Sequence, residues 1–208
     1  MPDATTFALF ALACLAFLAI PGPSVFYIVT RSLVQGRRAG VTSMLGVQTG
    51  GLVHVVAAAF GVSALIASSA AAFTVVKYTG AAYLVYLGLR KLLGREPDEP
   101  EVVGAPASTA RLFTHGVVVN VLNPKTALFF LAFLPQFVDP NAGPVALQML
   151  VLGLTLVCLG VLSDGTYALL AAGAGNHLRN RRRLERLSGG VFVGLGVFAA
   201  LAGEPRQS

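Results

Sequence analysis

Two long hydrophobic segments of this chain are each interrupted by proline near their middle. The first carries Pro21-Gly22-Pro23-Ser24 and the fourth carries Asn123-Pro124-Lys125. Proline has no backbone N–H, so inside a bilayer the carbonyls that it frees must be satisfied by neighbouring helices, polar side chains or water. Matched interruptions in the two halves of a membrane chain are typical of a transporter, whose substrate site lies between them near the bilayer midplane.

The composition indicates an integral membrane protein. Of its 208 residues, 55% are hydrophobic and only 12% are charged, whereas an average soluble domain has about 25% charged residues. The net charge of +6 comes from short basic clusters between apolar runs, without the basic stripe and stacking aromatics of a nucleic-acid-binding protein. We therefore expect membrane lipid, and no nucleic acid, around this chain.

Six segments are long and apolar enough to cross a hydrocarbon core of about 30 Å, which takes about 20 residues per helix. The predicted fold is all-α, a bundle of six transmembrane helices at about 6–30, 40–67, 71–89, 112–137, 145–172 and 187–201. Residues 94–111 contain three prolines and four acidic residues and are predicted to be a flexible cytoplasmic linker. This linker divides the chain into halves 1–93 and 112–208, and because each half has three spans, the second is expected to be inverted relative to the first.

Basic residues alternate between the connections. They follow the first, third and fifth segments: Arg31, Arg37 and Arg38; Arg90, Lys91, Arg95 and Arg111; Arg179, Arg181, Arg182, Arg183 and Arg186. The second and fourth connections contain no basic residue. By the positive-inside rule the three basic connections face the cytoplasm and both termini lie outside.

The residues around the two interruptions, together with a polar pair in the second segment, are the candidate substrate-binding groups. Carbonyls around residues 17–20, freed by proline, are able to coordinate a polar ligand. The alternative for the first interruption is a kink that only shapes packing, and for the pair in the second segment it is hydrogen bonding between helices, the more common use of such side chains. The predicted substrate-binding set is Pro21, Gly22, Pro23, Ser24, Gln48, Thr49, Asn123, Pro124 and Lys125.

Two ionisable residues lie deep in predicted spans. A lysine within a membrane costs about 3 kcal/mol on insertion scales and is usually kept for a partner or a pathway. Lys125, near the middle of the fourth segment, is interpreted as an anchor for a substrate carboxylate, with snorkelling to the surface as the alternative. Asp164 is the only acidic residue inside any segment, and it is interpreted as a counter-ion to Lys125, a proton site, or both.

Three further polar residues lie in the predicted spans. His54 is a secondary candidate for a proton relay, because imidazole titrates near neutral pH. His115 and Asn120, at the start of the fourth segment, are interpreted as structural. The sequence shows no Cys/His cluster for a metal and no phosphate-binding loop, so we expect no cofactor and no metal.

The chain resembles the lysine exporter superfamily, in particular its homoserine/threonine exporter branch. The resemblance is carried by Pro21-Gly22-Pro23, Gly36-x3-Gly40 followed by Gly46-x3-Gly50, the run 80–88, and Asn123-Pro124-Lys125. It implies six helices in the bacterial inner membrane, assembly as a homo-oligomer, and export of amino acids or related small metabolites driven by protons. It does not specify which amino acid is carried.

Two alternatives come from other classes of protein. A membrane thiol-redox carrier would require Cys14 and Cys158 to meet, and a passive channel or accessory subunit would show no coupling to an ion gradient. An enzyme is not expected, because no nucleophile–base pair or metal cluster lies in the segments.

Overall fold

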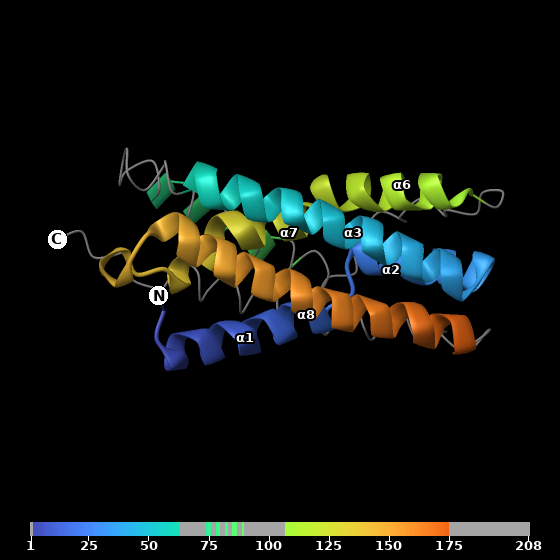
Figure 1. The fold of residues 1–208 in the computed structure, drawn as a ribbon, viewed down its shortest axis with the longest axis horizontal. Coiled ribbons are helices and arrows are strands. Elements are labelled where there is room, and N and C mark those ends of the chain that lie inside the picture. Colours follow the sequence, from blue (N-terminus) through green and yellow to red (C-terminus); the bar gives the residue numbers. More distant parts are fainter. Residues whose placement is uncertain are drawn as a thin grey trace.

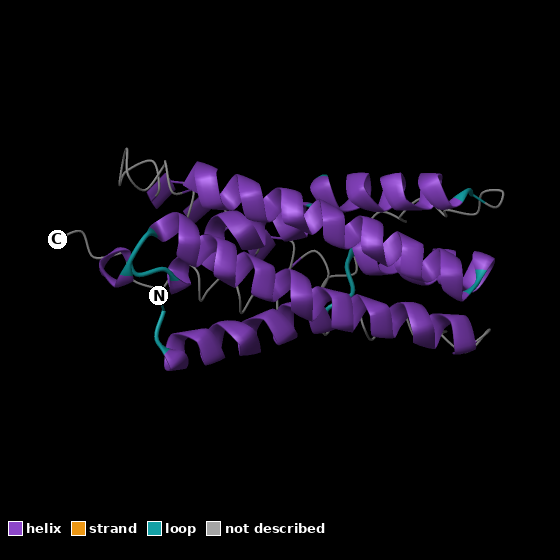
Figure 2. Cartoon of the chain, in the orientation of Figure 1, coloured by secondary structure: helices purple, strands orange, loops and turns teal. Residues whose placement is uncertain are grey.

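The computed structural model describes residues 2–62, 74–75, 78–79, 82, 85–86, 89 and 107–174, and none of these forms a strand (Figure 2). The elements are α1 (Ala4–Ala19), α2 (Pro23–Gln35), α3 (Arg37–Ala57), a π-helical turn η1 (Ala58–Val62), α6 (Thr109–Val121), α7 (Pro124–Leu128), η2 (Phe129–Phe133), η3 (Leu134–Phe137), η4 (Pro140–Ala142) and α8 (Val145–Ala174). The all-helical fold is thus confirmed for the described residues.

The first predicted span is two helices, as the proline motif indicates. Asp3 caps α1 by accepting a hydrogen bond from the Thr6 backbone N–H at 2.7 Å, which also lowers the pKa of the Asp3 carboxyl. The chain leaves the helix at Ile20 and re-enters it with Pro23 as the first residue of α2, where a missing N–H is tolerated. The axes of α1 and α2 differ by 53°.

The fourth predicted span is broken in the same way. Asn123 caps α7 through its side chain, Pro124 is the first residue of α7, and the bend from α6 is 46°. Residues 109–111, which the sequence placed in the linker, belong to α6, because Ser108 caps that helix with its side chain.

The two broken spans run in opposite directions (Figure 1). Aromatic side chains of α1 pack against the segment that follows α7, with ring centroids 5.1 Å apart for Phe10 and Phe137 and 4.3 Å for Phe17 and Phe129. At the other end α2 lies against α6, where the Tyr27 hydroxyl donates to the Leu112 carbonyl at 2.8 Å. Both breaks therefore lie at mid-depth in one bundle.

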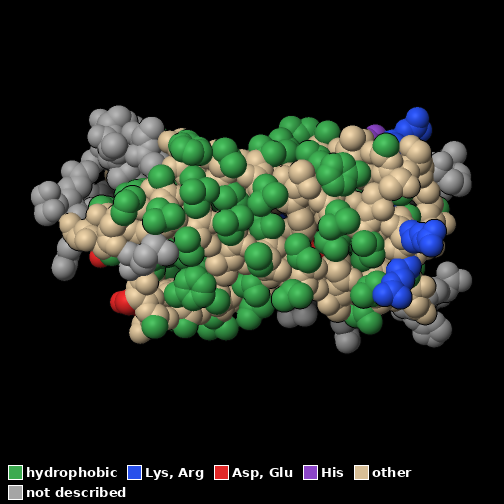
Figure 3. Space-filling model, viewed as in Figure 1, with side chains coloured by type: hydrophobic (Ala, Val, Ile, Leu, Met, Phe, Trp, Pro, Cys, Tyr) green, Lys and Arg blue, Asp and Glu red, His purple; other side chains and the backbone are tan. Residues whose placement is uncertain are grey.

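The described helices have the length and surface of membrane spans. Helices Arg37–Gly61 and Val145–Gly173 are long and apolar enough to cross a bilayer. The same holds for each of the two bent helix pairs when the pair is counted as one span. Large apolar side chains face outward along α1 and α8, and Figure 3 shows them over the flanks of the bundle. The third predicted span is described only at scattered helical positions, and the sixth lies outside the described residues.

Charge is separated between the ends of the bundle. Figure 3 shows Lys and Arg side chains at the end away from the N-terminus and acidic side chains at the opposite end. Arg37 and Arg38 are exposed there, at the α2–α3 junction. Arg31 differs from the prediction: α2 continues to Gln35, so Arg31 is a buried helical residue and not part of a connection.

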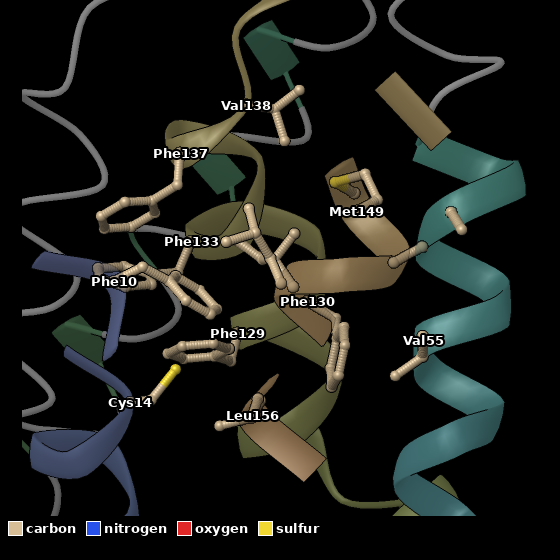
Figure 4. Packing of buried hydrophobic residues seen from close by; sticks show 14 of the residues in the cluster. Phe10, Cys14, Val55, Phe129, Phe130, Phe133, Phe137, Val138, Met149 and Leu156 are labelled. Carbon is tan, nitrogen blue, oxygen red and sulfur yellow. The ribbon is translucent and has the colours of Figure 1, made fainter. Parts of the chain in front are cut away.

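An aromatic cluster fills one half of the bundle. The buried side chains of Phe10, Phe129, Phe130 and Phe133 come together with Cys14 and residues of α8 (Figure 4). Their contacts join α1, which precedes the first break, to the segment after α7, which follows the second break. The packing therefore fixes these two segments relative to each other.

Helices α3 and α6 are in backbone contact at glycine. A Cβ atom added at Gly116 would lie 2.6 Å from the Ser43 carbonyl oxygen and 3.0 Å from the Val47 nitrogen, and one added at Gly46 would collide with the backbone of Phe113. Small residues allow membrane helices to approach in this way. The contact holds α3, which carries Gln48, against the part of α6 that ends at the break.

We predict that Gly116→Ala lowers the free energy of unfolding by about 1–3 kcal/mol, because backbone atoms cannot move aside as a flexible side chain would. The measurement is the thermal unfolding temperature of the purified protein in detergent. Gly173→Ala is the matched control, since nothing lies within 4 Å of an added Cβ there. Equal unfolding temperatures for the two variants would show that α3 and α6 are not so closely packed.

Candidate functional site

A cavity lies where the two breaks meet. Its volume is about 50 Å³, enough for a few water molecules. The lining is Phe17, Leu18, Gly22, Ser24, Val25, Val47, Gln48, Gly51, Asn120, Asn123, Lys125, Thr126, Phe130, Leu156, Val157, Gly160 and Asp164. Both interruptions, α3 and α8 thus contribute polar side chains to one cavity inside an otherwise apolar bundle.

The break in the first span frees two specific carbonyls. In an α-helix the carbonyl of residue i accepts from the N–H of residue i+4. Because Pro21 lacks an N–H and the chain leaves the helix at Ile20, the carbonyls of Phe17 and Ala19 have no helical donor. The Lys125 ammonium donates to the Phe17 carbonyl at 2.9 Å and also to the Ile20 carbonyl at 2.7 Å. The Tyr167 hydroxyl donates to the Ala19 carbonyl at 3.2 Å.

The proline of the second break frees the carbonyl of Asn120. The His54 Nε2 atom lies 3.0 Å from that oxygen, and because a carbonyl only accepts, Nε2 carries the hydrogen. The Asn123 backbone N–H also reaches the same oxygen at 3.0 Å, and the imidazole stacks on Phe130 with centroids 5.7 Å apart. Each of these freed carbonyls is therefore satisfied by a side chain from a different helix.

The Lys125 ammonium sits in a small cage at the end of α1. Besides the two carbonyls, the Phe17 ring lies beneath the charge, with Nζ 4.2 Å from its centroid, a cation–π distance. Gly22 leaves room for the side chain, because an added Cβ would lie 3.1 Å from Lys125 Cδ. Lys125 is only 7% exposed, so snorkelling does not account for its position.

Asn123 connects the two breaks directly. Its side-chain oxygen accepts from the Lys125 backbone N–H at 3.0 Å, and its amide nitrogen donates to Ser24 Oγ at 2.8 Å. Ser24 belongs to the first turn of α2. One side chain thus caps the helix after the second break and holds the helix after the first.

Asn120 extends this network to α3. Its Oδ1 accepts from Ser24 Oγ at 3.3 Å and from Thr126 Oγ1 at 2.9 Å, and its Nδ2 donates to the Val47 carbonyl at 2.7 Å. The side chain is 5% exposed and every one of these partners is buried. Asn120 is therefore a central member of the site, although the sequence analysis treated it as structural.

Asp164 supplies the acidic side of the cavity from the middle of α8. It is 4% exposed, and its Oδ2 accepts from the Gln48 amide at 2.8 Å. Gly160, one turn earlier, leaves space for Gln48, since an added Cβ would lie 2.8 Å from the amide oxygen. Lys125, from a broken span, and Asp164, from an unbroken one, line the same cavity.

The structure brings most of the predicted residues together. Six of them line the cavity: Gly22, Ser24, Gln48, Asn123, Lys125 and Asp164. The three prolines act through the carbonyls left free at the two breaks, and His54 lies beside the cavity on the Asn120 carbonyl. Thr49 does not line the cavity, and its hydroxyl donates to the Leu45 carbonyl of its own helix.

Three residues that contribute to this arrangement were absent from the predicted set: Asn120, Thr126 and Tyr167. The spacing Asn120-x2-Asn123 before a proline was visible in the sequence and signals side chains gathered at a helix end. Nothing local marks Tyr167, whose partner Ala19 is 148 residues away.

The cysteines do not form a pair in this structure. Cys14 is buried in the aromatic cluster and Cys158 is exposed, and both are free thiols. A thiol-redox carrier needs the two to meet, so this arrangement gives that alternative no support. No group of three or more His, Cys, Asp or Glu side chains able to hold a metal occurs among the described residues.

Two proline-broken antiparallel spans around a cavity with buried polar side chains are the architecture of a membrane transport protein. The chain belongs to the LysE type translocator family, whose model matches residues 15–203. The resemblance seen in the sequence is thereby confirmed, and members of this family are transporters and not enzymes.

Similar proteins span nearly the whole chain. An "uncharacterized membrane protein" of Vibrio cholerae is 35% identical, over 93% of this chain and 95% of its own length. The "homoserine/homoserine lactone efflux protein" of Salmonella typhimurium is 31% identical over 88% and 89%, and the "leucine efflux protein" of Klebsiella pneumoniae is 29% identical over 89% and 87%. No solved structure matches the chain.

We predict that Tyr167→Phe destabilises the protein by about 1 kcal/mol, because the Ala19 carbonyl then loses its donor inside the membrane. The measurement is thermal unfolding of the variant and of the wild-type protein in detergent. An unchanged unfolding temperature would show that the Tyr167 hydroxyl is not needed by the Ala19 carbonyl.

Proposed function

We propose that this chain is a secondary transporter that exports amino acids across the bacterial inner membrane and is driven by protons. The observation that carries the proposal is the placement of a buried lysine and a buried aspartate in one cavity between two broken spans. Family membership supports it, as do relatives whose names describe efflux of homoserine, homoserine lactone and leucine. An amino acid is a zwitterion, and this cavity offers a group of each sign.

The Lys125 cage is suited to a substrate ammonium. Two carbonyls and the Phe17 ring already hold a primary ammonium there. In this proposal the substrate's α-ammonium takes that place when the bundle opens, and Lys125 moves from the carbonyls toward the substrate's carboxylate. The lysine thus occupies the cage in the absence of substrate, which keeps the carbonyls satisfied in both states.

The carboxylate of the substrate would then be held by Lys125 and by the amide of Asn123. Asn123 is fixed between Ser24 and the start of α7, so its position depends on both breaks at once. Binding at this point is therefore sensitive to how α2 and α7 sit relative to each other. That sensitivity is what couples a ligand to a change between states with different access.

Asp164 is the proposed proton carrier. The protonation of a buried carboxyl depends on the charges near it, so displacement of the lysine that lines the same cavity would change the balance between its two forms. A membrane potential of 100 mV supplies about 2.3 kcal/mol per charge, and each tenfold accumulation costs about 1.4 kcal/mol. One proton per cycle is thus sufficient for export against a more than tenfold gradient.

The charged ends of the bundle support the predicted orientation. The basic end, with Arg37 and Arg38 exposed, is proposed to face the cytoplasm by the positive-inside rule, with both termini outside. The opposite directions of the two broken spans fit an inverted pair of three-helix halves that rock about the cavity. Assembly as a homo-oligomer is carried over from the family resemblance and is also a proposal.

The test is efflux of labelled amino acids from proteoliposomes with an imposed proton gradient. Wild-type protein should carry at least one amino acid in a gradient-dependent way, and Lys125→Ala or Asp164→Asn should reduce the flux at least tenfold. Asp139→Asn and Thr49→Ala are matched controls, because neither residue lines the cavity, and both should transport normally.

Other results would separate the remaining functions. Flux that does not respond to uncouplers would indicate a passive channel, and no flux for any amino acid would indicate a different cargo or an accessory role. Unchanged flux in both cavity variants would place the site elsewhere in the protein.

A further inference from the structure

Arg31 is a buried cation that takes no part in the central cavity. It is 5% exposed in α2, between the cavity and the basic end of the bundle. A buried guanidinium without a counter-charge is strongly unfavourable, so such residues are generally paired or kept for a ligand. Arg31 does not line the cavity and was interpreted from the sequence only as a topological charge.

The guanidinium is held in place, but no carboxylate in the described part of the chain neutralises it. Its Nη1 donates to the Gln35 side-chain oxygen at 3.2 Å, and Gln35 is itself fixed by donating to the Ala107 carbonyl at 3.0 Å. The Tyr27 ring lies beside the charge, with its centroid 5.8 Å from Arg31 Cζ. The Nε atom is buried and has no hydrogen-bond partner, and no carboxylate of the described residues forms an ion pair with Arg31.

The position of Arg31 connects it to the substrate site. Ser24, Ile28 and Arg31 follow helical spacing on one buried face of α2, and Ser24 lines the cavity. Seven residues of helix span about 10 Å, so Arg31 lies that far from Ser24 toward the basic end. Between them the Tyr27 hydroxyl bridges α2 to the Leu112 carbonyl of α6.

We propose that Arg31 is an outer binding site for the carboxylate of the amino acid as it enters from the cytoplasm, before it reaches Lys125. This rests on the proposed export function. A guanidinium presents paired N–H donors that match a carboxylate, and Arg31 has an unused donor and a side chain fixed by Gln35. The residue is buried on the inward face of its helix, so a ligand from the translocation path fits better than a lipid headgroup from outside the bundle.

The discriminating experiment compares L-homoserine with homoserine lactone, which lacks a free carboxylate, in inside-out vesicles that expose the cytoplasmic face. Arg31→Gln should raise the KM for homoserine at least tenfold with little change in the maximal rate, and leave the KM for the lactone unchanged. Arg31→Lys, which keeps the charge but not the paired donors, should fall between. Arg38→Gln removes an exposed charge at the same end and should change neither.

Equal changes for homoserine and the lactone, or none for homoserine, would overturn the proposal. A loss of transport confined to vesicles with anionic lipid would indicate a headgroup ligand and would also overturn it. If wild-type protein carries neither these compounds nor any other amino acid, the export function fails separately. Acetate should still raise the unfolding temperature of wild type more than that of Arg31→Gln, and equal shifts would refute the carboxylate site itself.

A stability measurement distinguishes a ligand-binding role of Arg31 from a merely structural one. Without ligand, Arg31→Gln should unfold at the same temperature as wild type or a higher one, because an uncompensated buried charge has been removed. A clear fall in unfolding temperature would mean that Arg31 is needed for folding through Gln35, and would count against a site kept for ligand.

Discussion

Two helix breaks organise the interior of this protein. The breaks at Pro21-Gly22-Pro23 and Asn123-Pro124 leave the carbonyls of Phe17, Ala19 and Asn120 without their helical partners, and hydrocarbon offers no water to replace them. The donors come from Lys125, Tyr167 and His54, which belong to other helices in each case. The interruptions are therefore the points at which separate spans are tied to one another, and the cavity is the space between those ties.

This arrangement gives Lys125 two roles with one set of contacts. In the closed bundle its ammonium completes the end of α1 by donating to the Phe17 and Ile20 carbonyls, which helps to explain how a buried lysine is tolerated there. The same carbonyls and ring would receive the ammonium of an amino acid in the proposed cycle. Gly22 and Gly160 keep the space around Lys125 and Gln48 open, so the small residues of the cavity are as necessary as its charges.

The sequence was sufficient to predict the helical membrane fold, both interruptions and most of the polar side chains that line the cavity, since proline and intramembrane charge have strong physical consequences in lipid. It was insufficient where the consequence depends on a distant partner. The place of Tyr167 follows only from the approach of α8 to α1, and Asn120 becomes central only because Gly46 and Gly116 bring α3 against α6. Arg31 was assigned to a connection because the local pattern did not show that α2 continues to Gln35.

In the proposed cycle Lys125 leaves the α1 carbonyls when substrate binds. This is tested by the rate at which a small amine-acylating reagent modifies Lys125 in proteoliposomes, followed by mass spectrometry. We predict strong protection of Lys125 without substrate, in keeping with its burial, and a clear increase in modification when a transported amino acid and a proton gradient are both present. The same rate of modification with and without transported substrate would contradict it.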